Sequence, residues 1–242
     1  SKRWLFFNID PDTIRVTTHG MFYSTTTMPL IFDAYLAAGE GDPSGLAMLN
    51  LMARFRPFNL GMVGDKFNKA VTVDLEKYKG LESISLGDSI MGAPSAEVLY
   101  PIIGKAWPIE LIRKDLREFQ ETDVEMLLVN GNLDFAVPPI TLNEAKPYFH
   151  KAQMVLLQEF SHSGDVMTLQ PEAFERLITS YYDTGVADSS LYVYQPLSFE
   201  PSIRTTTIAK LLVAAMIVLP VLVIWGVVAV VRRIRRRRTA NQ

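Results

Sequence analysis

The order of apolar and polar residues predicts alternating strands and helices in the C-terminal half of the chain. Apolar runs over residues 126–129 and 154–157 are bounded by polar segments and predict two buried strands. Residues 142–148 between them have a helical pattern. In the N-terminal part, residues 29–38 predict a short helix that ends before Gly39. Strands and helices that alternate in this way are typical of a mixed α/β domain.

Three further helices are predicted to begin at prolines. Asp42 precedes Pro43 as a predicted N-cap, and Pro108 and Pro171 stand where other helical patterns start. Gly185 follows the last of these patterns and is typical of a helix C-terminus. The residues at helical spacing after these prolines are Leu46, Leu49 and Met52, then Ile112, Leu116 and Phe119, then Phe174, Leu177, Ile178 and Tyr181.

The clearest physical signal is an uncharged apolar run over residues 211–231. As a helix it would extend about 30 Å, the thickness of the hydrocarbon core of a bilayer. An arginine-rich run follows at 232–238, and positive charge next to a membrane span is retained on the cytoplasmic side. We therefore predict a single transmembrane helix over 207–231, the lipid bilayer as its partner, a cytoplasmic C-terminus and an extracytoplasmic domain. Directly after a membrane span, the arginine run does not indicate nucleic acid as a partner.

Composition narrows the possible chemistry. The chain has 242 residues and a formal net charge of −2, so the part before the arginine run is acidic. It contains no cysteine, which excludes disulfides, thiolate metal sites and a cysteine nucleophile. Its three histidines lack the spacing of metal ligands, and no glycine-rich phosphate loop occurs. We therefore expect neither a metal nor a cofactor.

Asp134 and His162 are the candidate catalytic residues. Each follows one of the two predicted strands, which is the order of the last two members of a Ser…Asp…His triad. The chemistry needs this pair because the carboxylate fixes the imidazole tautomer and stabilises the imidazolium that forms when a serine loses its proton. We expect about 2.6–3.2 Å between the Asp134 carboxylate and a ring nitrogen of His162.

Other interpretations of these residues remain open from the sequence. Asp134 alone fits a turn residue after a strand, and His162 alone fits a surface histidine. Asp165 is a competing acid in the same loop, but its position is typical of a capping or solvated group. Residues 87–89, Gly-Asp-Ser, resemble the nucleophile block of GDSL-type hydrolases, which also need an Asp-x-x-His that this chain lacks.

Residues 127–139, Leu-Leu-Val-Asn-Gly-Asn-Leu-Asp-x-x-x-Pro-Pro, resemble the acid strand and turn of the α/β-hydrolase fold. The likeness is to the C-terminal part of the proline iminopeptidase and tripeptidyl-aminopeptidase-like branch. Residues 160–164 stand where that family has its histidine loop, and residues 83–88 and 107–108 resemble two further landmarks. The likeness covers roughly residues 25–185. It implies hydrolysis of an ester, or of a peptide at its N-terminal end, by acyl transfer to water.

The family's nucleophile motif, Gly-x-Ser-x-Gly, is missing from this sequence. Ser89 has Gly87 two positions before it but Met91 two positions after it. We expect the serine and the oxyanion hole upstream of Ser1, in a preceding segment or a separate N-terminal fragment. The alternative function is a non-catalytic, hydrolase-like accessory subunit of a membrane complex, with other membrane subunits as partners.

The predicted architecture is the C-terminal portion of an α/β-hydrolase fold, followed by one transmembrane helix. It comprises the end of the cap and the last core strands and helices. Residues 1–27 are mixed and threonine-rich and resemble cap or loop, and residues 82–86 predict a brief strand. The predicted divisions are the end of the cap at 1–60, the hydrolase core at 61–185, an extended stalk at 186–206, the transmembrane helix at 207–231 and a basic tail at 232–242.

Overall fold

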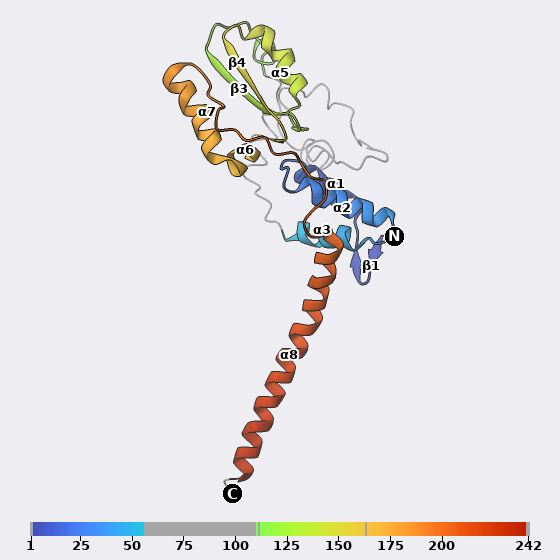
Figure 1. Cartoon of the computed structure of the whole chain (residues 1–242). Coiled ribbons are helices and arrows are strands. Elements are labelled where there is room, and N and C mark those ends of the chain that lie inside the picture. Colours follow the sequence, from blue (N-terminus) through green and yellow to red (C-terminus); the bar gives the residue numbers. More distant parts are fainter. Residues whose placement is uncertain (1, 56–109, 111, 163, 241–242) are drawn as a thin grey trace.

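The computed structural model describes residues 2–55, 110, 112–162 and 164–240. These residues form a mixed α/β structure with two small sheets and one long C-terminal helix (Figure 1). A group of N-terminal helices lies between a small α/β unit and the long helix. The predicted strand at 82–86 and the family landmarks at 83–88 and 107–108 lie outside the described residues.

The first 55 residues form a hairpin and three helices: β1 (Arg3–Trp4), β2 (Phe7–Asn8), α1 (Pro11–Met21), α2 (Met28–Gly39) and α3 (Ser44–Arg54). The helices predicted at 29–38 and after Pro43 are confirmed. Helix α1 was not predicted, because residues 1–27 were interpreted only as cap or loop. Asp10 caps α1 by accepting a hydrogen bond of 3.3 Å from the backbone N–H of Thr13, and Pro11 opens the helix.

These helices form one apolar core with the start of the long C-terminal helix. Their buried residues include Ile14 and Met21 of α1, Ile31 of α2, Met48 of α3, and Ala209 further along the chain. Most of the stability of a short helix comes from packing an apolar face against its neighbours. The core therefore explains why α1 forms although much of its sequence is polar.

The α/β unit contains the two predicted strands, β3 (Met126–Gly131) and β4 (Ala152–Leu157). They pair in parallel, with Met126 opposite Ala152 and Gly131 opposite Leu157. The connection between them consists of α5 (Pro139–Ala145) and a 3-10 turn, η3 (Lys146–Tyr148). Because the strands are parallel, their C-terminal ends meet at one edge, where the Asp134 and His162 loops begin.

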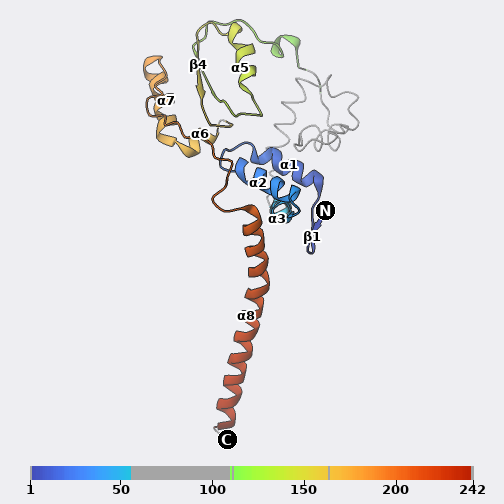
Figure 2. The same cartoon turned by 45° about the vertical axis from the view of Figure 1, so that its right-hand side comes forward.

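Two helices follow β4: α6 (Gly164–Leu169) and α7 (Pro171–Thr184). Gly185 ends α7 at a φ of 75°, and its N–H donates a hydrogen bond of 2.8 Å to the carbonyl of Tyr181. Helices α5 and α7 lie on opposite sides of the sheet (Figures 1 and 2). Phe174 of α7 packs against the buried cluster of Leu157, Phe160 and Val166, which also receives Val129 and Val155 of the strands.

The prediction of a helix after Pro108 is wrong for the residues of this segment that the structure describes. Residues 112–119 contain only a 3-10 turn, η2 (Lys114–Leu116). Leu116 and Phe119, two residues of the predicted apolar face, are exposed. An amphipathic pattern forms a stable helix only where its apolar face can pack, and none of the described residues of this face is fully buried.

Residues 186–204 contain neither helix nor strand, as expected for an extended stalk, but they lie against the protein. The Tyr192 hydroxyl donates a hydrogen bond of 2.6 Å to the carbonyl of Gln158, and the Leu197 N–H donates one of 2.9 Å to Glu159 Oε2. The ring of Phe199 lies 5.1 Å from that of Phe32 on α2. This segment returns the chain from the α/β unit to the N-terminal helices.

The long helix α8 (Thr205–Ala240) is anchored at its first residue. The Asp33 carboxylate accepts hydrogen bonds from the Thr205 N–H at 2.7 Å, the Thr205 hydroxyl at 2.6 Å and Arg204 Nε at 3.0 Å. Gly45 of α3 lies so close to Thr205 that a Cβ there would overlap the threonine side chain. The start of α8 is thus part of the folded core.

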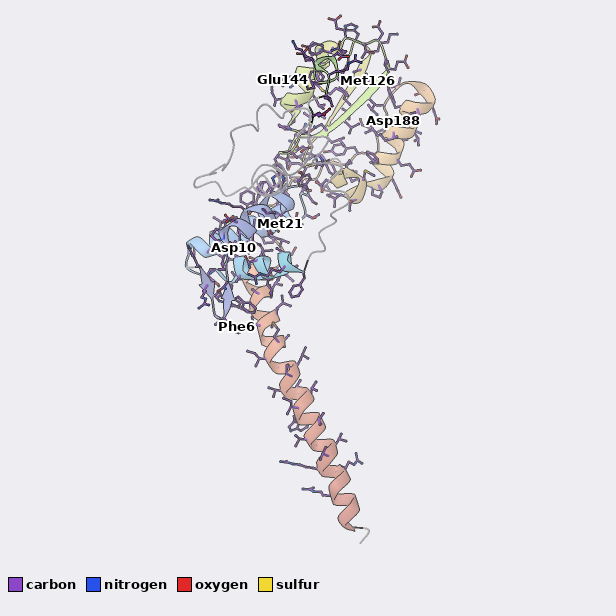
Figure 3. All side chains as sticks on the ribbon, turned by 180° about the vertical axis from the view of Figure 1, so that it is seen from behind. Phe6, Asp10, Met21, Met126, Glu144 and Asp188 are labelled. Atoms are coloured by element: carbon purple, nitrogen blue, oxygen red, sulfur yellow. The ribbon has the colours of Figure 1, made fainter. Side chains whose placement is uncertain are left out.

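Beyond its first turns, α8 leaves the body of the protein and carries exposed apolar side chains (Figure 3). The stretch Thr205–Arg233 is long and apolar enough to cross a membrane, and very little of it is buried. Pro220 lies within the helix without ending it. The structure thus contains the membrane-spanning element predicted from the sequence, as far as length and composition define one.

Candidate functional site

Asp134 lies in the turn that follows β3, and its carboxylate is almost completely buried. Oδ1 accepts hydrogen bonds of 2.9 Å from the backbone N–H groups of both Ala136 and Val137. The side-chain amide of Asn130, near the end of β3, holds the same turn by donating to the carbonyl of Val137 at 2.8 Å. These bonds fix the carboxylate and leave Oδ2 available to another partner.

That partner is His162, in the loop after β4. Its Nδ1 lies 2.8 Å from Asp134 Oδ2, within the range expected from the sequence. The Asp134 side chain is 4% exposed and the His162 side chain 32%. None of the described residues is hydrogen-bonded to the other ring nitrogen, Nε2. The imidazole is therefore oriented from its buried side and accessible from its outer side.

The histidine loop is held directly against the Asp134 turn. Leu133 N–H donates a hydrogen bond of 3.0 Å to the carbonyl of Phe160, and Asn132 Oδ1 accepts one of 2.7 Å from Glu159 N–H. The backbone of Gly131 approaches the Phe160 and Ser161 carbonyls so closely that any Cβ would overlap them. Glycine is the residue that allows two backbones to come this near.

Asp165 fastens this loop to the N-terminal segment. Its carboxylate accepts hydrogen bonds from the Ser24 hydroxyl at 2.7 Å, the Thr25 hydroxyl at 2.8 Å and N–H at 3.1 Å, and the Ser161 N–H at 3.0 Å. The residue is buried, so of the two roles predicted for it, a capping group or a solvated group, the second is wrong. Its hydrogen bonds hold the loop, and the imidazole of His162 bonds to Asp134 instead.

Aromatic side chains at the end of α1 and in the Asp134 turn form a cluster beside His162. The Tyr23 ring meets the His162 ring edge to face at 4.9 Å, and Phe135 lies against Tyr23 at 5.2 Å and His19 at 4.9 Å. Burial lowers the pKa of His19. Burial, together with the negative charge of Asp134, raises the pKa of Tyr23. Neutral aromatic rings thus lie beside His162.

The sequence did not single out Tyr23, His19 or Ser24 as parts of the site. All three lie at or after the end of α1, which was predicted as cap or loop. The Asp10-Pro11 pair was a usable signal for that helix, because Asp at the N-cap and Pro at the first position are favoured there. No local signal indicates that its end contacts His162.

Other polar groups of the described chain do not extend the pair into a complete triad. The Ser161 hydroxyl donates to the carbonyl of Phe22, and the Ser24 hydroxyl donates to Asp165. Within the described ranges, no serine is hydrogen-bonded to His162, and no group of three or more His, Asp or Glu residues could hold a metal ion. His150 pairs with Asp123 at 3.1 Å on the exposed surface.

Comparison with protein-family models, with curated proteins and with solved structures finds no match to this chain.

Proposed function

We propose that this chain contributes the acid and the histidine of a membrane-anchored serine hydrolase. The observation that carries the proposal is the 2.8 Å contact between Asp134 Oδ2 and His162 Nδ1, with Nε2 on the accessible side. In acyl-transfer enzymes a buried carboxylate on Nδ1 orients the imidazole, and Nε2 takes the proton of the serine.

In this mechanism His162 is first the general base and then the general acid. Asp134 accepts a hydrogen bond from the Nδ1–H of His162, and this tautomer has the lone pair of the neutral ring on Nε2. The imidazolium that forms during serine attack is stabilised by the adjacent carboxylate, which two backbone N–H groups hold in position. The proton then passes from Nε2 to the leaving group, and a water molecule completes the hydrolysis by the same route.

The nucleophile and the oxyanion hole are proposed to come from sequence that precedes Ser1. The fold does not choose between a peptidase and an esterase. The resemblance of residues 127–139 to the acid turn of the proline iminopeptidase-like branch favours a peptidase that acts at peptide N-termini. On this basis the chain is the C-terminal portion of an α/β-hydrolase fold.

Helix α8 is proposed to anchor the enzyme in the bilayer. The apolar run within it ends at residue 231, and arginines occupy six of the next seven positions. Because such residues are retained in the cytoplasm, the domain with Asp134 and His162 would face the opposite side.

A fluorophosphonate probe tests the proposal on the membrane protein with its upstream part present. Labelling should be lost in His162→Ala, and Asp134→Asn should reduce turnover by about 10⁴-fold because the imidazole then adopts the wrong tautomer. His150→Ala is the matched control, since it removes a histidine that also pairs with an aspartate, but on the exposed surface.

The alternative is a non-catalytic accessory subunit of a membrane complex. Absence of labelling in correctly folded wild-type protein, together with an upstream segment that lacks an elbow serine, would establish that alternative. Labelling that survives His162→Ala would show that a different base serves the serine, and the proposed site would then be wrong.

A further inference from the structure

The β1–β2 hairpin ends in two large apolar residues. Leu5 and Phe6 connect the strands, and they are 62% and 65% exposed. Leu5 has a φ of 51°, a conformation that hairpin turns normally assign to glycine, asparagine or aspartate. In water, a tight turn is expected to be polar, so this tip is unsuited to an aqueous surface.

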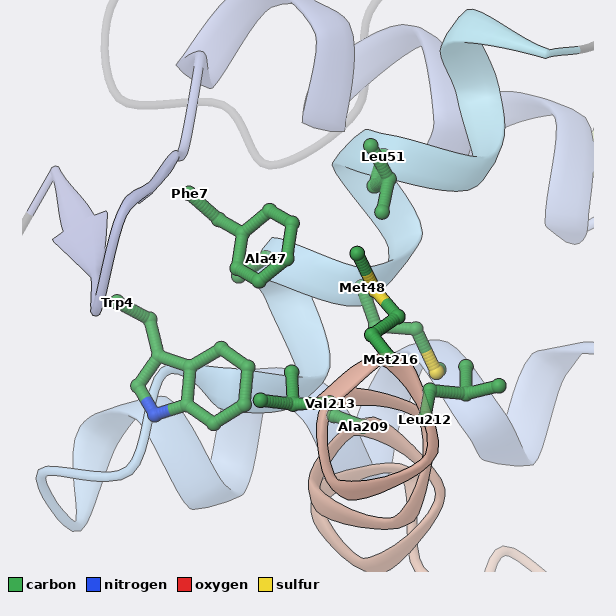
Figure 4. A pocket seen from close by; sticks show the side chains of 9 residues that line it. All are labelled: Trp4, Phe7, Ala47, Met48, Leu51, Ala209, Leu212, Val213 and Met216. Carbon is green, nitrogen blue, oxygen red and sulfur yellow. The ribbon is translucent and has the colours of Figure 1, made fainter. Parts of the chain in front are cut away.

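The hairpin lies beside the first turns of α8. Trp4 and Phe7 line an apolar notch together with Leu212, Val213 and Met216 of that helix, and α3 closes its inner side (Figure 4). Phe6 lies at the end of the body from which α8 emerges (Figure 3). The exposed tip and the apolar run of α8 therefore form one continuous apolar surface.

Charged residues just before and within the first turns of α8 define the level at which this surface begins. Arg204 pairs with Asp33 at 3.0 Å, and Lys210 pairs with Asp42 at 2.7 Å. Lys210 is the last charged residue before the apolar run. Met216, which lines the notch with the hairpin, lies six positions further on, or about 9 Å along the helix axis. Through this notch, Trp4 and Phe7 of the hairpin lie alongside residues of the proposed membrane span.

We infer that the hairpin of residues 3–8 is a second membrane contact, with Leu5 and Phe6 immersed in the leaflet that faces the domain. This inference rests on the proposed anchorage of α8 in a bilayer. The occupant is lipid rather than another protein, because the surface continues directly into the apolar side chains of α8. Trp4 and Phe7 lie where aromatic residues are enriched in membrane proteins, near the boundary of the hydrocarbon region.

The consequence is a fixed orientation of the domain on the membrane. A single helix allows the domain to tilt and rotate, whereas two contacts on one rigid core do not. The hairpin and the start of α8 share the core that contains Met48 and Ala209. The α/β unit, which carries Asp134 and His162, lies on the far side of the N-terminal helices from α8 (Figure 1).

Depth-dependent fluorescence quenching in lipid vesicles tests the inference on the full chain. The chain has three tryptophans, Trp4, Trp107 and Trp225, and each test protein keeps a single tryptophan because the others are replaced by Phe. In the first test protein the single tryptophan is Trp225, and in the second it is introduced by Phe6→Trp. A control reporter is Tyr182→Trp on α7, where the native residue is 83% exposed. Phosphatidylcholine brominated near either end of its acyl chains is the quencher.

We expect the Phe6→Trp reporter to lose most of its emission with lipid brominated near the headgroup, and less with lipid brominated near the chain ends. The Tyr182→Trp control should keep its emission. If Trp225 is quenched but the Phe6→Trp reporter is not, the hairpin inference is wrong and the anchorage stands. If the Phe6→Trp reporter is shielded from aqueous acrylamide but not quenched by lipid, a protein covers the tip and the inference is also wrong. If Trp225 is not quenched, the anchorage itself fails.

Discussion

The backbone of Gly131, at the end of β3, lies directly against the carbonyl of Phe160 in the histidine loop. These residues belong to the two segments that carry Asp134 and His162. Their close approach explains how two loops, separated by a helix and a strand in the sequence, hold a carboxylate and an imidazole within hydrogen-bonding distance. Several properties of the site depend on contacts of this kind.

Gly131→Ala should displace the histidine loop. The added Cβ overlaps the Phe160 and Ser161 carbonyls, which are backbone atoms that cannot move independently of the loop. We expect a decrease of about 1–3 kcal/mol in the free energy of unfolding, the usual cost of overpacking. Denaturant unfolding in detergent measures it. Gly164→Ala is the control, because its Cβ has no neighbour within 4 Å; equal effects of the two variants would contradict the contact.

Asp165→Asn should loosen the N-terminal segment from the histidine loop. The carboxylate is buried and accepts four hydrogen bonds, and an amide cannot accept at both positions. A buried donor without a partner costs about 1–3 kcal/mol, so we expect a loss of about 2 kcal/mol or more in unfolding free energy. Asp123→Asn removes an exposed partner of His150 and should cost less than about 1 kcal/mol. A loss for Asp165→Asn as small as that control would show that its hydrogen bonds are dispensable.

His19 should make stability depend on pH near neutrality. Burial lowers its pKa from the ordinary value of 6.5, so the unfolded chain takes up the proton first as the pH falls. Stability contributed by the neutral ring is complete above 6.5, the unfolded-state value, and is lost progressively as the pH falls from there through the lower pKa of the folded state. Comparison of unfolding at about pH 7.5 and about pH 5.5 should show a smaller decrease in His19→Phe than in wild type. An identical decrease in the two proteins would rule out this role.

The orientation of α8 can be tested with a single cysteine, because the chain contains none. Asn241→Cys should react with a membrane-impermeant maleimide only after cells are permeabilised, since the preceding arginines keep this end in the cytoplasm. Tyr182→Cys, on the exposed surface of α7, should react in intact cells. Labelling of Asn241→Cys in intact cells would reverse the proposed topology.

Elements with a strong local pattern were predictable from the sequence. The strands at 126–131 and 152–157, the helix from Pro171 and the apolar tail each carry their own periodicity, length or terminating residue. The pairing of Asp134 with His162 was also predictable, because parallel strands bring the loops after them to one edge of a sheet. These inferences need only information that lies within a short window of the chain.

Only the tertiary structure decided which distant segments bury the carboxylates of Asp165 and Asp33. Asp165 has the local appearance of a solvated residue, but Ser24 and Thr25 bury it from about 140 positions away. Asp33 likewise accepts a hydrogen bond from the N–H of Thr205, the first residue of α8. A local pattern specifies the hydrogen-bonding capacity of a side chain, whereas its partner and its burial depend on which surfaces meet when the whole chain packs.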